Sequence, residues 1–567
     1  MLPKRFLWMV GAEEMRPGEM VGDRYLVKDD RLALDTKPGS APEMPRDVLP
    51  SMEPYLRLIS HRLHVPQLYA VVQNQIVLLE SAAIFPEGAR SSKGEDLAGR
   101  LMPAIAQVWS QSSALRQLNL LWQWAQLWQP LSSETVASTL LDPARLRVDG
   151  GTIKITDLVF DRSNTPSLSD LGQLWSQWQA QPEISEFFNQ LHQNLIDGQI
   201  ASADQLVETL DQGLAACGTQ QTRQIRFATF TDQGPSRQSN EDECYPPSGS
   251  NFSSDQTLPL VIVCDGIGGH EGGEVASRLA IQSIANHAQL IPTDQPAAIV
   301  TDTLAEAIFG ANDVITQRND AEQRQERQRM GTTVVMGLAH GHELYIAHVG
   351  DSRAYRISRT GCYQVTLDDD VASREVRLGY TLYREALQHP SAGSLVQALG
   401  MGSSSYLYPN IQRFILDEDS VFLLCSDGLS DHDRVEECWQ TEIAPILDGK
   451  LDVATVARKL IDVANTRNGH DNVTVGVIHC QVRNKAKSGS TQASLSVVPA
   501  AVTQPTQISA PATTRQPAPA STELKTQLVQ PKRRWAAIAL TLLGLLGFGG
   551  ILAFILVPEI RNTIVQT

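Results

Sequence analysis

Four acidic residues flank short apolar runs that are typical of buried strands. Asp265 follows LVIVC, Asp351 follows YIAHVG, Asp427 follows FLLCS, and Asp471 precedes NVTVGVI. If these strands stop at one edge of a sheet, the carboxylates lie close together, and neighbouring like charges cannot all stay ionised unless a cation lies among them. A single aspartate beyond a strand is more often a turn residue. Four in this context predict a cation site.

The residue types and spacing around this site indicate which ligand it takes. Oxygen ligands without a nearby set of cysteine or histidine favour Mg²⁺ or Mn²⁺ over zinc. The segment DGIGGHEGGEVAS passes five glycines between a strand and a helix, so its backbone can approach a metal or a phosphate closely. Upstream, SRQSNED places Arg237 shortly before Glu241 and Asp242, and a guanidinium matches phosphate oxygens. Alone, a glycine-rich turn is a weak signal, and a lone arginine is usually a solvated charge.

Seven motifs in order carry a resemblance to a known family. SRQSNEDE, CDGIGGHEGGEVAS, MGTTVV, VGDSRAY, HPSAGSLVQALG, CSDGLSD and GHDNVTVGV occur in the order and approximate spacing of the PPM (protein phosphatase 2C) metal-dependent serine/threonine phosphatases. The resemblance covers residues 223–482. It implies a β-sandwich of two antiparallel sheets flanked by helices, with a two-metal site at one edge.

The resemblance also implies a role for each matched residue. Asp265 is similar to the carboxylate that bridges both metals, Gly266 to the backbone carbonyl ligand, and Arg237 to the residue that holds the substrate phosphate. Asp427 and Asp471 are similar to ligands of the first metal. Glu241 and Asp242 are similar to groups that act mainly through metal-bound waters. Asp351 and Asp431, together with Asp427, resemble the residues that contribute to a third, weaker metal site in some members.

The chemistry implied is hydrolysis of phosphoserine and phosphothreonine by a water that two Mn²⁺ or Mg²⁺ ions activate, with no protein nucleophile. Ile267 stands where eukaryotic members often carry a histidine, as is usual in bacterial relatives, so the leaving alkoxide would take its proton from a metal-bound water. The segment from Asp368 to Gly400 resembles the flap beside the active site and is expected to shape substrate choice.

Composition changes divide the chain into five parts. Residues 1–216 are expected to form a separate α+β N-terminal domain, and residues 223–482 the phosphatase domain. Residues 483–531 are rich in Pro, Thr, Gln and Ser, which predicts a disordered linker. Residues 535–557 are free of charge and long enough, at roughly 34 Å as a helix, to span a membrane, and 558–567 form a short tail.

Charge and cysteine usage predict where the chain lies. Lys532, Arg533 and Arg534 precede the expected span and only Arg561 follows it, so both folded domains are expected in the cytoplasm. No secretion signal is expected at the start, and the seven scattered cysteines read as reduced thiols. The net charge of −16 removes any electrostatic basis for nucleic-acid binding. A single-pass membrane protein with phosphorylated proteins as partners is predicted.

Residues 20–216 faintly resemble a degenerate protein-kinase domain, in the segments MVGDRYLV, QIVLLES, LDPARLRVDGGTIKITDLVFD and LSDLGQLWSQW. The glycine-rich phosphate loop and the H-R-D aspartate are missing, and only Asp157 stands where a D-F-G would be, so kinase catalysis is not expected. An unrelated helical binding domain is an equal alternative, with Trp109, Trp122, Trp124 and Trp128 as core residues. Either reading predicts a regulatory or binding role, with a regulatory partner.

The sequence offers two alternatives to a metal-dependent phosphatase. Cys217 and Arg223 have the C-x₅-R spacing of cysteine-dependent phosphatases, but no histidine precedes the cysteine and the stretch joins two domains. A membrane scaffold with an inactive phosphatase fold is the second. The complete set of metal and phosphate residues favours the enzyme.

Overall fold

The computed structural model describes residues 4–12, 15–45, 47–73, 75–91, 93–162, 165–267, 272–292 and 295–485, which belong to one compact unit. The predicted span at 535–557, the tail at 558–567 and all but residues 483–485 of the predicted linker lie outside these residues. Within the described ranges, no helix is both long enough and apolar enough to cross a membrane.

The first region, residues 4–218, begins with a six-stranded antiparallel sheet in the order β2-β3-β4-β1-β6-β5. Its strands are β1 (Arg5–Val10), β2 (Met20–Val21), β3 (Tyr25–Asp29), β4 (Leu32–Asp35), β5 (Gln67–Val72) and β6 (Ile76–Glu80). Strands β5 and β6 pair antiparallel in the segments QLYAVV and IVLLE.

Helices make up most of the remainder of the first region. They are α1 (Glu53–Arg57), a 3₁₀ helix at Leu58–His61, α2 (Ile105–Trp109), α3 (Ala114–Ser133), α4 (Leu168–Trp175), α5 (Ser185–Ile196) and α6 (Ala203–Gly218), with a hairpin of β7 (Leu146–Asp149) and β8 (Thr152–Ile155). Ser113 caps α3 by accepting a hydrogen bond from the Arg116 N–H at 3.2 Å. Trp109, Trp122, Trp124 and Trp128 are all buried, which confirms their predicted place in the core.

The second region, residues 221–485, is built on two antiparallel sheets in the orders β10-β12-β15-β16-β19 and β11-β9-β21-β20-β17-β18. Their strands, with the short pair β13–β14, are β9 (Gln221–Asp232), β10 (Glu243–Tyr245), β11 (Asn251–Ser253), β12 (Leu260–Cys264), β13 (Gly266–Ile267), β14 (Gly331–Thr332), β15 (Val334–His340), β16 (Glu343–Val349), β17 (Arg353–Ile357), β18 (Cys362–Gln364), β19 (Asn410–Ile415), β20 (Ser420–Cys425) and β21 (Val473–Asn484).

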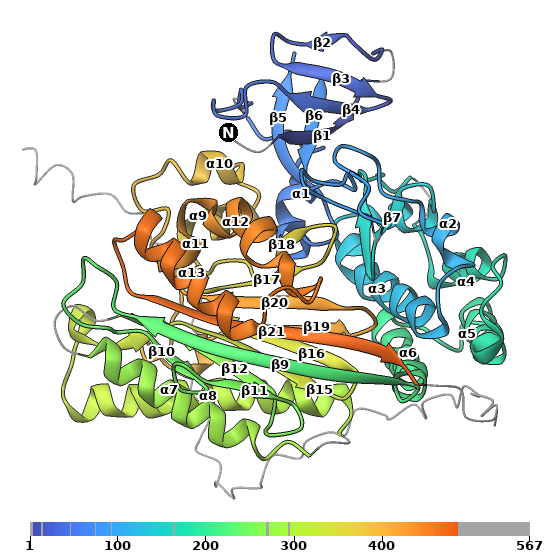
Figure 1. Ribbon diagram of the computed structural model, residues 1–567. Helices are drawn as coiled ribbons and strands as arrows, with labels where there is room; N and C mark the ends of the chain where they lie inside the picture. The colour runs from blue at the N-terminus through green and yellow to red at the C-terminus, as the bar shows by residue number, and fades with distance from the viewer. Residues whose placement is uncertain are drawn as a thin grey trace, which may run out of the picture. The chain divides into compact units, whose positions relative to one another are not determined.

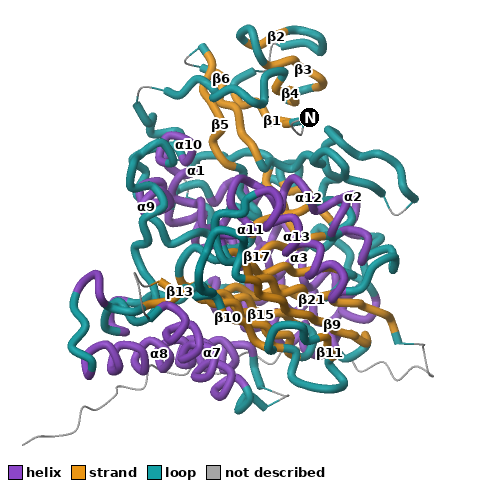
Figure 2. The backbone as a smooth tube through the Cα atoms, turned by 60° about the vertical axis from the view of Figure 1, so that its left-hand side comes forward, coloured by secondary structure: helices purple, strands orange, loops and turns teal. Residues whose placement is uncertain are grey.

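The two sheets pack face to face with helices on both outer sides, as Figure 1 shows. The helices are α7 (Gly273–Ala288), α8 (Ala297–Ala321), α9 (Val371–Arg377), α10 (Tyr383–Ala386), α11 (Asp427–Ser430), α12 (Arg434–Glu442) and α13 (Val453–Arg467). Helices α7 and α8 share a core with the five-stranded sheet, and α12 and α13 share one with the six-stranded sheet. Figure 2 shows the strands running through the middle between these helices.

A third core lies between the sheets and explains the unbroken apolar runs. Val263 and Ile346 of one sheet and Leu424 and Ile478 of the other belong to it. Because both faces of the central strands are covered, β12, β16 and β20 are buried at every position and show no polar alternation. The predicted sandwich flanked by helices is therefore confirmed.

The ends of the second region pair with each other. Strand β21 continues to Asn484, beyond the predicted domain limit at 482, because β9 pairs with it along its whole length, from Val473 with Asp232 to Asn484 with Gln221. The predicted domain limits at 216 and 223 fall near the short link from α6 to β9. They stay a prediction, since both regions lie in one compact unit.

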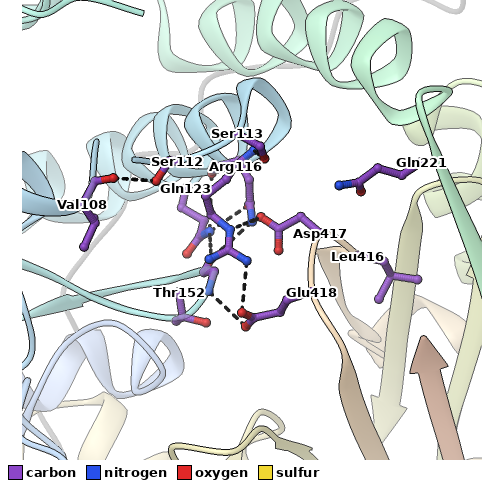
Figure 3. Close-up of polar contacts among 12 residues, drawn as sticks. Val108, Ser112, Ser113, Arg116, Gln123, Thr152, Gln221, Leu416, Asp417 and Glu418 are labelled. Atoms are coloured by element: carbon purple, nitrogen blue, oxygen red, sulfur yellow. Dashed lines mark hydrogen bonds and ion pairs between the residues drawn. The ribbon is translucent and has the colours of Figure 1, made fainter. Parts of the chain in front are cut away.

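A partly buried ion cluster joins the two regions (Figure 3). Asp417 and Glu418, in the turn between β19 and β20, receive hydrogen bonds from Arg116 of α3. Glu418 also accepts from Arg356 of β17 at 2.6 Å and from the Gly151 N–H at 3.0 Å. The first region is thus held on the second by charges from three segments that are distant in sequence.

Candidate active site

The strand directions bring the four predicted carboxylates to one edge of the sandwich. Strands β12 and β16 both pair antiparallel with β15, so they run parallel to each other, and Asp265 and Asp351 follow their carboxyl ends. Strands β20 and β21 are antiparallel, so Asp427, after β20, and Asp471, before β21, lie at the same end of that pair. The strands of each pair therefore end together as predicted, but the two pairs belong to two stacked sheets and not to one sheet.

The carboxylates are buried and lie close enough for their charges to act on one another. Burial raises the pKa of Asp265 well above its usual range, and the charges of Asp242, Asp427 and Asp351 add to this rise. Burial together with neighbouring carboxylates also raises the pKa of Asp242 and of Asp351 to about 7 and that of Asp427 to about 6. These groups therefore resist ionising together, as expected for a site that needs a counter-charge.

Two oxygen atoms of this cluster have no hydrogen-bond partner. Oδ1 of Asp242 and Oδ1 of Asp427 are buried and unpaired. Such orphaned acceptors are costly unless a proton or a cation satisfies them. Among the described residues, however, no group of three or more histidine, cysteine or acidic side chains is arranged so that it could hold a metal as it stands. The donor set fits a hard divalent ion, and the individual ligand roles remain predictions.

Glycine is required where the chain leaves β12. A Cβ on Gly266 would lie 2.5 Å from the Glu241 carbonyl oxygen and 2.5 Å from the Gly273 carbonyl carbon. A Cβ on Gly273 would lie 2.3 Å from Glu241 Oε2. The start of α7, the strand β13 and the Glu241 segment can therefore meet only because these positions carry no side chain, as the glycine-rich sequence predicts.

The remaining predicted residues form the rim of the site. Nη2 of Arg237 donates to Oδ2 of Asp471 at 2.6 Å, and the arginine side chain is about half exposed, at 47%. Burial raises the pKa of Glu241, and the charge of Arg237 opposes that rise. Asp431 contributes to the raised pKa of Asp427 and faces Nε2 of His470 at 3.2 Å. The contacts and charge interactions described above therefore link all nine predicted site residues to the carboxylate edge.

Several polar residues that support the site were not predicted. Asn472 accepts from the Glu241 N–H at 2.9 Å and donates to the carbonyls of Gln233 and Ser239, so it ties the Arg237 loop to β21. Ser426 donates to Oδ2 of Asp242 at 2.8 Å. The motifs GHDNVTVGV and CSDGLSD contain both, but sequence alone did not distinguish these supporting groups from ligands.

The thiol alternative is not supported by the structure. Burial raises the pKa of Cys217 to about 11, whereas a nucleophilic cysteine needs a lowered pKa. Arg223 donates to the carbonyls of Leu416 and Gly218 instead of facing an open pocket. All seven cysteines are free thiols, as predicted.

Comparison with known proteins places the second region in a family. The family model described as "Protein phosphatase 2C" matches residues 235–462. The chain is 31% identical over 260 residues to the serine/threonine phosphatase stp of Listeria welshimeri. This match covers 46% of this chain and 98% of that protein. It is 32% identical over 253 residues to the serine/threonine protein phosphatase PstP of Mycobacterium tuberculosis, covering 45% of this chain and 44% of that protein.

A solved structure of the PstP catalytic domain in complex with 2 manganese ions is 30% identical, covers 46% of this chain and 100% of that chain, and has a TM-score of 0.36. The assignment rests on the sequence match, which spans nearly the whole length of the Listeria protein. Together with the carboxylate edge and the sandwich, it shows that this chain belongs to the protein phosphatase 2C family of serine/threonine phosphatases.

Proposed function

We propose that the chain hydrolyses phosphoserine and phosphothreonine in proteins with the help of two divalent ions, Mn²⁺ or Mg²⁺, bound at the carboxylate edge. The observation that carries this proposal is the set of buried carboxylates at the strand ends, with unpaired oxygens on Asp242 and Asp427, because burial and neighbouring like charges favour a cation there. When bound, such ions supply a nucleophilic water at neutral pH and neutralise charge on phosphoryl oxygens.

The metal roles follow the family resemblance. Asp265, Asp427 and Asp471 would hold the ions with the Gly266 carbonyl, Glu241 and Asp242 would act through waters, and Asp351 and Asp431 would serve a third ion with Asp427.

This chain's own residues prepare the site in two ways. The Asp265 backbone is fixed by Thr333, whose Oγ1 accepts from the Asp265 N–H at 3.1 Å, and by Thr332, which donates to the Asp265 carbonyl at 2.9 Å. Arg237, half exposed at the rim, can exchange its bond to Asp471 for a bond to a substrate phosphate. A carboxylate on an anchored backbone and an exposed arginine at the rim suit the binding of a phosphorylated side chain from solvent.

An assay of the full chain in detergent tests the reaction class. We expect hydrolysis of phosphothreonine and phosphoserine peptides with Mn²⁺ or Mg²⁺, a loss of about 100-fold or more in excess EDTA, and recovery when Mn²⁺ is restored. A phosphotyrosine peptide is the matched control and should be a poor substrate. Full turnover in EDTA would contradict the metal-dependent mechanism. If no ion supports turnover, the result would favour the alternative of a scaffold with an inactive phosphatase fold.

We further propose that the first region regulates or recruits and has no kinase activity. Asp157, which stands at the position of the D-F-G aspartate, is buried, and its carboxylate accepts hydrogen bonds from Arg145 and from Thr156. A phosphoryl-transfer site also needs a catalytic base and a phosphate loop, and the sequence of this region lacks both the H-R-D aspartate and the glycine-rich loop. The missing groups and the pairing of Asp157 together support a binding role over phosphate transfer.

We also propose that residues 535–557 tether the enzyme to a membrane as a single helix, with both folded regions in the cytoplasm. The support is the uncharged run and the three basic residues that precede it, Lys532, Arg533 and Arg534. We expect the full chain to stay in the membrane fraction in high salt and to dissolve in detergent, and a variant that ends at Gln530 to be soluble. Release of the full chain by salt alone would exclude a spanning helix.

A further inference from the structure

The flap, residues 368–400, is tied at both ends to the candidate active site. Near its start, Oδ2 of Asp369 accepts from the N–H of Gly350, the residue before Asp351, at 3.0 Å. Near its end, Leu399 and Thr332 exchange two backbone hydrogen bonds of 2.9 and 3.1 Å. Thr332 in turn donates to the Asp265 carbonyl. Both ends of the flap are therefore anchored beside the segments that carry two site carboxylates, independently of how its middle is held.

The middle of the flap packs on the first region. Ala372 and Val376 of α9, with Leu382 and Ala386 in and before α10, are buried and belong to the main hydrophobic core of the first region. That core also includes Tyr55, Leu56, Leu58 and Ile59, and α9 packs against α1 and the 3₁₀ helix that carry these four residues. The flap thus takes its apolar floor from residues more than 300 positions earlier in the chain.

An ionic clamp fastens α10 to the first sheet. Nη2 of Arg384 and Nη1 of Arg5 both lie 2.8 Å from Oε2 of Glu80, at the end of β6. The Arg384 guanidinium also lies over the Tyr69 ring, 4.9 Å from its centroid. The three charged side chains are between 23% and 32% exposed, so water screens the clamp only in part.

The outward side of the same flap presents apolar side chains to solvent. Leu378 is 47% exposed, Tyr380 is 67% exposed and Leu387 is 50% exposed. Exposed apolar and aromatic side chains on the flap are suited to contact a protein substrate, which offers far more surface than a small phosphate ester. Their positions depend on how firmly the buried side of the flap is held.

We propose that Glu80 and Arg384 are positioning residues that hold the flap on the first region and thereby set the affinity for phosphoprotein substrates. The inference rests on the proposed phosphatase function. It gives the first region a role in substrate recognition through the flap, because Glu80 and the residues of the apolar floor belong to that region. Neither residue acts on the phosphate itself.

The test compares the full chain with its Glu80→Gln and Arg384→Met variants. We expect KM for a phosphothreonine protein to rise about 3- to 30-fold, with p-nitrophenyl phosphate hydrolysis within about twofold of wild type. Backbone amides of residues 371–387 should exchange hydrogen faster in both variants. Glu375→Gln is the matched control, because Glu375 lies on α9 but pairs only with its neighbour Arg374 at 2.9 Å among the ion pairs of the described residues.

Each outcome has a defined meaning. Unchanged KM with unchanged hydrogen exchange would overturn the proposal, and so would a parallel loss of small-ester and protein hydrolysis, which indicates damage to the site itself. An effect of the same size in Glu375→Gln would also overturn it. If even the wild-type chain hydrolyses neither substrate, the proposed function fails instead, while hydrogen exchange still reports whether the clamp holds the flap.

Discussion

Asp265→Asn is expected to lower phosphatase activity on the order of 1,000-fold without unfolding the chain. The neutral amide cannot supply the charge that the proposed ions need. The metal-free native state, in contrast, should become more stable when the Asp265 carboxylate is removed. Because burial and three neighbouring carboxylates raise the pKa of Asp265, the ionised group destabilises the metal-free native state. The thermal midpoint measured in EDTA should therefore equal or exceed that of wild type.

Asp255→Asn is the control for this substitution, since Asp255 is an exposed aspartate ten residues upstream. It should change neither activity nor the effect of Mn²⁺ on the midpoint. Wild-type activity in Asp265→Asn would show that this carboxylate is not essential. A collapse of the midpoint in EDTA would show that its role is structural, contrary to the repulsion described above.

Glu418→Ala is expected to destabilise the chain by about 2 kcal/mol, because it removes the shared partner of two guanidiniums. Arg116 and Arg356 both donate to Glu418, and their side chains are only 18% and 7% exposed, so water replaces the lost carboxylate poorly. The expected loss is smaller than for a fully buried pair, since Glu418 itself is 24% exposed. The urea midpoint of the full chain measures it.

Glu437→Ala provides the comparison. Glu437 pairs with Arg434 at 2.8 Å within the single helix α12, where such a pair contributes about 0.5 kcal/mol or less. Equal losses for the two variants would mean that the cluster in Figure 3 adds no more than a surface pair does. A second, earlier unfolding step in Glu418→Ala would show that the two regions come apart before the sandwich unfolds.

Local patterns predicted the buried strands and the acidic edge, whereas the sandwich was implied by the family resemblance. The apolar runs that precede Asp265, Asp351 and Asp427 become strands β12, β16 and β20, because covered strands need apolar side chains on both faces. Asp265 and Asp427 could be singled out because each directly follows such a run. The supporting roles of Ser426 and Asn472 could not be predicted, because a hydrogen bond between segments that are distant in sequence produces no periodic pattern in the sequence.

The sequence by itself determined the elements, the family and the carboxylates, because each of these depends on neighbouring residues or on short motifs in order. Only the tertiary structure decided that the two regions share an interface and that the flap stands on the first one. Glu80 and Arg384, or Arg116 and Glu418, are some 300 residues apart, and each is an ordinary surface charge when read in its own segment. Such pairs form only when helices and strands pack against one another, because burial and charge complementarity then act between residues that are distant in sequence.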